Sequence, residues 1–584
     1  MSLAKIQEPP DKGLILLVGA PGAGKSTFCH QMAVKSVALD RPVIFVTSEQ
    51  SPADVTEQLQ GKGMGALVEM NFVDAFSETV GLTATGRPDT VYANCADLNS
   101  LSIAITKQQE KTGLQNTLLI FDSLTSPYLF SGVEVVKFMR LFLSKFAAEG
   151  NAVLALVDEG CGKEEDLGAM MSVADGIIRM ETEQGQRILN VIKHPQVEPA
   201  KIPISGNADA PPIPYETESA TLIKFAEADR YVVRSMMGRW NFRKKLGDWV
   251  NILWYQLVFW GGLQWDPVRF PPLLYTMAKD RNREIKYIFL MLPWYLRPFI
   301  RLLLLLVPKK PGVKTFRRIW RFLGRTGIDE GHYAVEYLDE ISRDDEHHLR
   351  KREGAGVWGF PNVGAALCFH EAGEFAGNFN AFDRQGRDWD GVEYMCIGRG
   401  DPYCQLKFTP RKPPEFQEFL RGFDASKLEK LNEHIIGRIL SLVLHGEGLP
   451  KRPTLRDEIH LHEIQGDTSR HAAFSERYQA ILRMAGANSG RKIAELLRDN
   501  GVKEAEATKG LIDLFQLTKA GGLAVGETIT IEENWESYGL RIGQPFCFFT
   551  TGFLNGFFWT VKHQHVKETK CVAAGDPICE WEII

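Results

Sequence analysis

Short apolar runs alternate with helix-like stretches through the first two hundred residues. The runs GLILLVG, VIFVT, LLIF and AVLALV contain no charged residue, which is typical of strands buried on both faces of a sheet. The stretches between them have helical spacing. Strands that alternate with helices predict a mostly parallel, doubly wound α/β sheet. Residues 1–205 are therefore predicted to form one α/β domain.

A glycine-rich stretch, GAPGAGKST, follows the first apolar run and precedes a helical pattern. It matches the motif G-x-x-x-x-G-K-[ST] of a phosphate-binding loop. Glycines let backbone N–H groups curl around phosphate oxygens, the lysine neutralises the β- and γ-phosphates, and the next hydroxyl ligates Mg²⁺. The motif predicts an ATP and Mg²⁺ site that contains Gly19, Gly22, Gly24, Lys25, Ser26 and Thr27.

Acidic residues end two further predicted strands. Glu49 follows VIFVTS, and Asp122 ends LLIFD. Asp122 is placed to hold Mg²⁺ together with Ser26, through the water shell of the ion. Glu49 is placed to orient and deprotonate an attacking water. We therefore predict Glu49 as the catalytic residue of an ATPase.

Residues 1–205 resemble the RecA-like ATPases of the KaiC branch, in the loop GAPGAGKST, the strands VIFVTSEQSP and LLIFDSLTS, and the segment ADGIIRMETEQGQRILNVIKH. The resemblance implies a RecA-like fold and leaves a homo-oligomer open. The family carries two glutamates after the second strand, but here Gln50 follows Glu49. In the family a Lys-x-Arg pair reaches across to the nucleotide of a neighbouring subunit, which implies that Lys193 binds nucleotide there, but Pro195 replaces the arginine. These departures predict slow hydrolysis and a weakened ring assembly.

The pattern changes after this domain. Residues 206–240 are predicted to be a linker, because this part of the chain is rich in proline and polar residues. Beyond it, helical spacing is combined with many aromatic residues, as in WVNILWYQLVFWGGLQW. Basic and aromatic residues are mixed here, which a nucleic-acid or lipid surface would also show. The simpler interpretation is a set of helices whose aromatic face packs a core.

Composition and charge exclude several classes of protein. The net charge of −5, from 68 basic and 73 acidic residues, gives no general field for nucleic acid. The most apolar segment, residues 288–310, is interrupted by Pro293, Arg297, Pro298 and Arg301, so it predicts a buried helical hairpin rather than a transmembrane helix. A membrane-surface element is the alternative. The N-terminus MSLAKIQEPPDKG lacks the apolar core of a signal peptide, so we expect a cytoplasmic protein.

A cysteine frame occurs twice in the second half of the chain. Both copies read Cys-x4-Gly-x3-Gly and then Glu-x2-Cys-x3-Gly-Asp-Pro-x-Cys, which indicates a duplication. The first copy contains Cys368, Gly373, Gly377, Glu393, Cys396, Gly400, Asp401, Pro402 and Cys404, and the second contains Cys547, Gly552, Gly556, Glu568, Cys571, Gly575, Asp576, Pro577 and Cys579.

Three thiolates and one carboxylate can complete a tetrahedral Zn²⁺ site. The Gly-Asp-Pro turn brings its flanking cysteines together, and the earlier cysteine ties that turn to the domain body. Glu393 and Glu568 are the expected fourth ligands, with His370, His563 and His565 as rivals. The alternative is that the cysteines are buried only as small apolar side chains.

The two frames resemble the 4-vinyl reductase-type domain, an α/β module with a helical half and an antiparallel sheet. The resemblance is clear over about 455–584 and over about 325–410, and it implies domains at 241–410 and 455–584 with a helical connector at 411–454. It also implies a small hydrophobic or aromatic ligand beside a structural zinc site.

These features together favour a ligand-responsive ATPase in which two zinc-stapled sensory domains act on a P-loop domain. Two alternatives stay open. One is an ATP-dependent enzyme or chaperone for a tetrapyrrole-like or aromatic substrate. The other is a scaffold that binds ATP without hydrolysing it.

Overall fold

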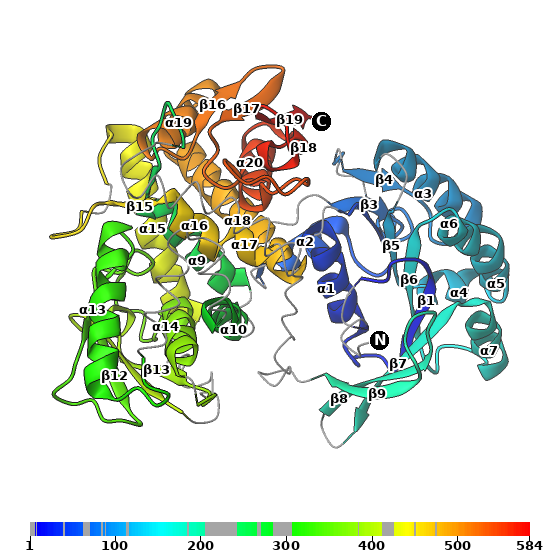
Figure 1. Cartoon of the computed structure of the whole chain (residues 1–584). Helices are drawn as coiled ribbons and strands as arrows, with labels where there is room; N and C mark the ends of the chain where they lie inside the picture. The colour runs from blue at the N-terminus through cyan, green and yellow to red at the C-terminus, as the bar shows by residue number, and fades with distance from the viewer. Residues whose placement is uncertain are drawn as a thin grey trace. The chain divides into compact units, whose positions relative to one another are not determined.

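The computed structural model divides the chain into two compact units, Met1–Asp209 and Ala210–Ile584 (Figure 1). The structure describes all residues except 1–5, 7–8, 39–40, 62–69, 83–85, 88, 113–115, 184–185, 205–241, 266–269, 284–306, 384, 411–424, 449–450 and 473–475. The predicted linker and most of the predicted helical hairpin lie outside the described residues. No helix within the described part of the chain is long and apolar enough to cross a membrane.

The first unit is built on a nine-stranded sheet with the order β4-β3-β2-β5-β6-β1-β7-β8-β9. Strands β4 to β7 in this order pair in parallel, and β8 and β9 add an antiparallel edge. The prediction of a mostly parallel sheet is confirmed. The strands are β1 (Gly13–Gly19), β2 (Val43–Thr47), β3 (Met70–Asp74), β4 (Thr90–Tyr92), β5 (Leu118–Asp122), β6 (Ala152–Asp158), β7 (Gly176–Glu183), β8 (Gln186–Lys193) and β9 (Ala200–Ile204).

Helices connect these strands. Every residue of β2 and β5 is buried, so these strands need a layer of side chains on each face, and the connecting helices supply it. The helices are α1 (Lys25–Ala38), α2 (Pro52–Gly61), α3 (Leu98–Thr112), α4 (Thr125–Ser131), α5 (Glu134–Phe138), the π-helical turn Met139–Leu143, α6 (Ser144–Ala148) and α7 (Glu164–Val173).

The second unit contains two four-stranded antiparallel sheets of the same topology. Their orders in space are β11-β12-β14-β13 and β16-β17-β19-β18. Along the chain, one helix follows β12 and leads to β13, and another follows β17 and leads to β18. The repeated cysteine frame thus corresponds to a repeated fold. The first repeat has β11 (Ala334–Tyr337), β12 (His347–Arg352), α14 (Phe369–Phe382), β13 (Asp390–Met395) and β14 (Cys404–Thr409), and the second has β16 (Gly522–Val525), β17 (Thr528–Glu532), α20 (Phe548–Lys562), β18 (Val566–Lys570) and β19 (Cys579–Ile583).

In each repeat, the helix between the sheet strands packs closely against one other helix. Helix α10 (Phe270–Arg283) lies on α14, and α18 (Glu476–Asp499) lies on α20. A Cβ atom at Gly373 would lie 2.1 Å from the carbonyl oxygen of Tyr275, and one at Gly552 would lie 2.0 Å from that of Arg483. The first glycine of each frame therefore allows two helix backbones to touch, which only glycine permits.

The two repeats interlock through matching segments. The short strands β10 (Trp249–Asn251) and β15 (Glu458–His460) pair antiparallel, with Val250 opposite Ile459. Arg243, before β10, donates to the carbonyl oxygen of Glu533 in the second repeat, and Arg452, before β15, donates to that of Glu353 in the first. Each repeat therefore begins with a segment held by the other, and the helices Ile252–Trp265 and Phe270–Arg283 belong to the helical half of the first repeat.

The remaining elements complete this unit. They are α9 (Ile252–Trp265), α13 (Val313–Asp329), α15 (Ala425–His445), α16 (Leu461–Asp467), α17 (Ser469–Ala472) and α19 (Glu504–Leu517). Trp254 on α9 and Trp320 on α13 are almost fully buried in one continuous core. The aromatic residues of this region thus form a core, as the sequence predicts.

Candidate nucleotide and metal sites

The glycine-rich loop joins β1 to α1. Gly22 has φ of +79° and Gly24 has φ of +99°, a left-handed conformation that residues with a Cβ rarely adopt. The loop leads directly into the N-terminus of α1. Backbone N–H groups and the helix dipole favour the binding of anions such as phosphate at this end of a helix. The predicted strand–loop–helix context is confirmed.

Lys25, the first residue of α1, is buried and held over the loop. Its ammonium donates to the carbonyl oxygens of Gly19 and Ala20, at 2.9 and 2.8 Å, and pairs with Asp158 Oδ1 at 2.6 Å. Asp158 ends β6, which lies beside β1 in the sheet. We did not predict Asp158 from the sequence, although an acidic residue at the end of AVLALVD is a recognisable signal.

Ser26 and Asp122 meet at the carboxyl end of β5. Ser26 Oγ donates to Asp122 Oδ1 at 3.2 Å. Burial, followed by repulsion from the nearby Glu49, raises the pKa of Asp122 to about 7. A hydroxyl and a buried carboxylate at one point are oxygen ligands that suit Mg²⁺, and the ion would also relieve that repulsion.

The other residues predicted to act at the nucleotide site lie at different places in the first unit. Glu49 is exposed and follows β2, next to β5, and its Oε1 accepts from Ser123 Oγ at 2.7 Å. Thr27 lies in the first turn of α1. Lys193 ends β8 and donates to the carbonyl oxygen of Ala174 at 2.9 Å. The predicted role of Lys193 at the nucleotide of a neighbouring subunit stays a prediction.

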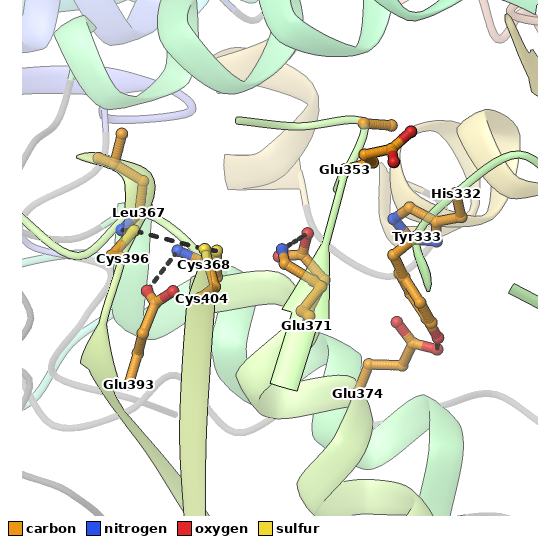
Figure 2. A network of polar contacts seen from close by, with 12 residues as sticks. His332, Tyr333, Glu353, Leu367, Cys368, Glu371, Glu374, Glu393, Cys396 and Cys404 are labelled. Carbon is orange, nitrogen blue, oxygen red and sulfur yellow. Dashed lines mark hydrogen bonds and ion pairs between the residues drawn. The ribbon is translucent and has the colours of Figure 1, made fainter. Parts of the chain in front are cut away.

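The first cysteine frame closes into a compact buried group. Cys368, Glu393, Cys396 and Cys404 offer ligand atoms that all lie within 4.8 Å of one another. Cys404 Sγ is 3.5 Å from Cys368 Sγ and 3.9 Å from Cys396 Sγ. The Leu367 N–H donates to Cys396 Sγ at 3.4 Å. Figure 2 shows Glu393 pointing toward the three sulfur atoms.

The second frame repeats this arrangement. Cys547, Glu568, Cys571 and Cys579 also offer ligand atoms within 4.8 Å of one another. Cys547 Sγ lies 3.5 Å from Cys571 Sγ and 3.6 Å from Cys579 Sγ. The N–H groups of Phe546 and Val572 donate to the sulfur atoms. None of the cysteines forms a disulfide.

The Gly-Asp-Pro turn has a defined structural role in both frames. Gly400 and Gly575 have φ of +88° and +115°, and each ends a short 3₁₀ turn that starts after a cysteine. The Asp401 carboxylate accepts from the Cys396 N–H at 2.8 Å, and Asp576 accepts from that of Cys571 at 2.9 Å. The aspartate thus fixes the backbone of the cysteine that begins the turn.

Both glutamates carry a buried oxygen suited to a cation. Glu393 Oε1 and Glu568 Oε1 have no hydrogen-bond partner in the structure. Burial raises the pKa of Glu393 well above its usual range, and burial with the neighbouring Cys571 raises that of Glu568 to about 9. The nearest cations are Lys351 beside the first group and Arg483 beside the second. A metal ion at each group would let the carboxylate and the three sulfur atoms carry negative charge together.

The rival histidine ligands lie elsewhere. His370 pairs with Asp467, His565 stacks on Trp559 with ring centroids 4.4 Å apart, and His563 follows the last residue of α20 with φ of +56°. The carboxylate, rather than an imidazole, completes each group. These Cys₃Glu groups could each hold one metal ion.

Comparisons with known proteins agree with this division. The family model "ATPase: KaiC" matches residues 7–198, and the model of the 4-vinyl reductase domain matches residues 528–584. UPF0273 proteins of Methanopyrus kandleri and Methanocaldococcus jannaschii are 26% and 27% identical to this chain over 185 and 184 residues, which cover 30% of this chain and 71% and 74% of those proteins.

Among solved structures, a KaiC-like protein of Pyrococcus horikoshii OT3 matches 33% of this chain and 85% of its own, with 17% identity and a TM-score of 0.27. The flagellar accessory protein FlaH of Methanocaldococcus jannaschii matches 32% of this chain and 80% of its own, with 16% identity and a TM-score of 0.25. The chain thus carries a KaiC-like, nucleotide-binding P-loop ATPase domain at its N-terminus and a 4-vinyl reductase domain near its C-terminus.

Proposed function

We propose that this protein is a ligand-responsive regulatory ATPase. The observation that carries the proposal is the combination of a P-loop site in the first unit with two matched Cys₃Glu groups in the second. Each group would hold one Zn²⁺ as a structural staple. A small hydrophobic or aromatic ligand would favour one state of the second unit and thereby change nucleotide affinity or turnover in the first. The cytosol, which keeps thiols reduced, would suit such sites.

On the nucleotide side, Lys25 and the loop N–H groups would hold the phosphates. Ser26 and Asp122 would hold Mg²⁺, which neutralises phosphate charge. Glu49 would accept a proton from the attacking water. Because Gln50 and Pro195 occupy positions that are acidic and basic in the family, we expect slow turnover and a weakened ring assembly.

On the sensory side, the staples would fix the helices that line an aromatic core. Cys547 immediately precedes α20, and Phe549 and Phe553 on that helix contact Trp254. Phe515 and Trp535 complete the group around this indole. A metal that anchors the start of α20 would therefore order the aromatic side chains that an apolar ligand would meet.

The direct test of the proposal is ATP turnover by the full chain, measured with and without phenol as a small aromatic probe. Binding of phenol should be followed separately through tryptophan fluorescence. A change in turnover that saturates with phenol binding would support ligand control. Phenol that binds without changing either turnover or ATP affinity would contradict it.

Glu49→Gln should retain ATP and lose hydrolysis. Loss of a general base typically lowers a rate by about 10²–10⁴-fold, whereas the amide leaves the phosphate contacts in place. Gln50→Ala is the matched control, because Gln50 contacts Gln58 and should not affect turnover. Turnover in Glu49→Gln equal to that of the unmodified chain would remove Glu49 from the mechanism.

A further inference from the structure

A second buried polar group lies beside the first cysteine frame. It contains His332, which precedes β11, His370 in the first turn of α14, and Asp467, the last residue of α16. The three residues are only 1%, 0% and 3% exposed, and their ligand atoms lie within 4.8 Å of one another. Asp467 comes from the second repeat, so the group forms where the two repeats interlock.

The two imidazoles face the same carboxylate. His370 Nε2 is 2.9 Å from Asp467 Oδ1, and His332 Nε2 is 3.9 Å from Asp467 Oδ2. His332 Nδ1 lies 3.3 Å from Glu463 Oε2, and the Tyr255 hydroxyl donates to Asp467 Oδ2 at 2.8 Å. His332 thus has Nδ1 on the carboxylate of Glu463 and Nε2 facing Asp467. Metal-binding histidines typically have one ring nitrogen on a carboxylate in this way and bind the ion with the other.

The surrounding charges favour a cation. Besides Asp467, the carboxylates of Glu371 and Glu374 are buried here, and that of Glu463 is largely covered. Lys351 pairs with Glu371, which lies between the cysteine group and His332 in Figure 2. Among the described atoms, Glu374 Oε2 and His370 Nδ1 are buried without a hydrogen-bond partner. Asp467 and Glu463 thus place two carboxylates against the imidazoles, and either a protonated imidazole or a divalent ion would balance their charge.

The second repeat shows that packing alone does not require these side chains. Ala520 corresponds to His332, because their carbonyl oxygens accept from the matching N–H groups of Trp535 and Ala355. Phe549 corresponds to His370, since both are the second residue after the first cysteine of the frame.

Val258 corresponds to Asp467, because each lies two positions after a glutamine with matching contacts, Gln256 and Gln465. All three counterparts are apolar and buried. The polar group therefore occurs at one of two equivalent positions, and apolar side chains fill the other.

We propose that His332 Nε2, His370 Nε2 and the Asp467 carboxylate bind a divalent transition-metal ion such as Zn²⁺ or Fe²⁺. Two imidazoles and a carboxylate form a donor set for these ions and leave coordination positions open. Ligands about 2.0–2.2 Å from one tetrahedral ion lie about 3.4 Å apart. His332 Nε2 would therefore move slightly toward Asp467, and His370 Nε2 slightly away from it. This site is separate from the cysteine groups and does not depend on the proposed function.

The test uses the full chain loaded with Co²⁺ after removal of other metals. Thiolate-bound Co²⁺ shows sulfur-to-metal charge-transfer bands, whereas a His₂Asp site adds only weaker ligand-field bands. Asp467→Asn and His370→Phe should each lower the bound Co²⁺ by one equivalent and leave the charge-transfer bands unchanged. Metal content measured by mass spectrometry on native protein would show which ion the site selects.

Asp390→Asn is the matched control. Asp390 is equally buried and also accepts from a tyrosine, Tyr275, but lies outside the group. It should retain the full Co²⁺ content. His332→Ala, which installs the residue of the second repeat, should reproduce the loss without unfolding the chain. Unchanged Co²⁺ content in folded Asp467→Asn and His332→Ala proteins would overturn the proposal.

Discussion

Lys25→Ala is expected to lower ATP affinity by about a hundredfold or more. The ammonium is held at the start of α1 by Gly19, Ala20 and Asp158, so it is already positioned over the loop. Hydrogen bonds to charged groups contribute about 1.5–3 kcal/mol each, and an ammonium can make more than one to a triphosphate. Calorimetry with Mg²⁺ and ATP measures the loss.

Two further variants sharpen this result. Lys137→Ala removes an exposed lysine that pairs with Glu134 on α5, and it should leave ATP affinity unchanged. Asp158→Asn should retain ATP binding, because Asp158 pairs with the Lys25 ammonium in the absence of nucleotide and does not itself bind phosphate. ATP affinity that stays the same in Lys25→Ala would show that the loop is not the nucleotide site.

Each cysteine group is expected to hold one Zn²⁺. Cys571→Ser and Cys396→Ser should each lower the zinc content of the chain by one, because three protein ligands cannot hold the ion as tightly as four. The bound zinc should be released in acid, as thiolates and carboxylates take up protons. Elemental analysis of reduced protein that has not met a chelator gives the count. Cys95→Ser, a buried cysteine of the first unit, is the control.

Loss of one staple should have local consequences. Cys571→Ser should loosen the turn at Cys571 and the start of α20, and the P-loop unit should keep its ATP affinity in the absence of ligand. Absence of zinc from both cysteine groups would contradict this account and leave the cysteines as core residues. If only one group holds zinc, we expect it to be the one in the C-terminal 4-vinyl reductase domain, residues 528–584.

Local patterns predicted much of this molecule. The loop around Lys25 and the buried runs such as VIFVT define their own structure, because motif, strand and helix are contiguous in the chain. The Cys₃Glu groups were also predictable, since identical spacing in two copies links side chains that the fold must bring together. The choice of Glu393 over His370 follows from the register of β13 and β14, which spacing alone does not give.

Long-range contacts account for what the sequence did not predict. Asp158 reaches Lys25 only because β6 is placed beside β1. Arg243 lies at the start of the predicted first domain, but its hydrogen bond to the second repeat is a long-range contact that no local pattern identifies. Asp467 contacts His332 and His370 through another long-range contact. The pairing of β10 with β15 brings α16 of the second repeat against the first repeat.

The central claim is that the sensory unit and the ATPase unit are thermodynamically linked. Titration calorimetry on the full chain measures this directly, through ATP affinity with and without saturating phenol and phenol affinity with and without ATP. Coupling requires both affinities to change by the same factor, typically about 5–150-fold. Phenol binding that leaves ATP affinity unchanged, together with phenol affinity that ATP leaves unchanged, would contradict the account.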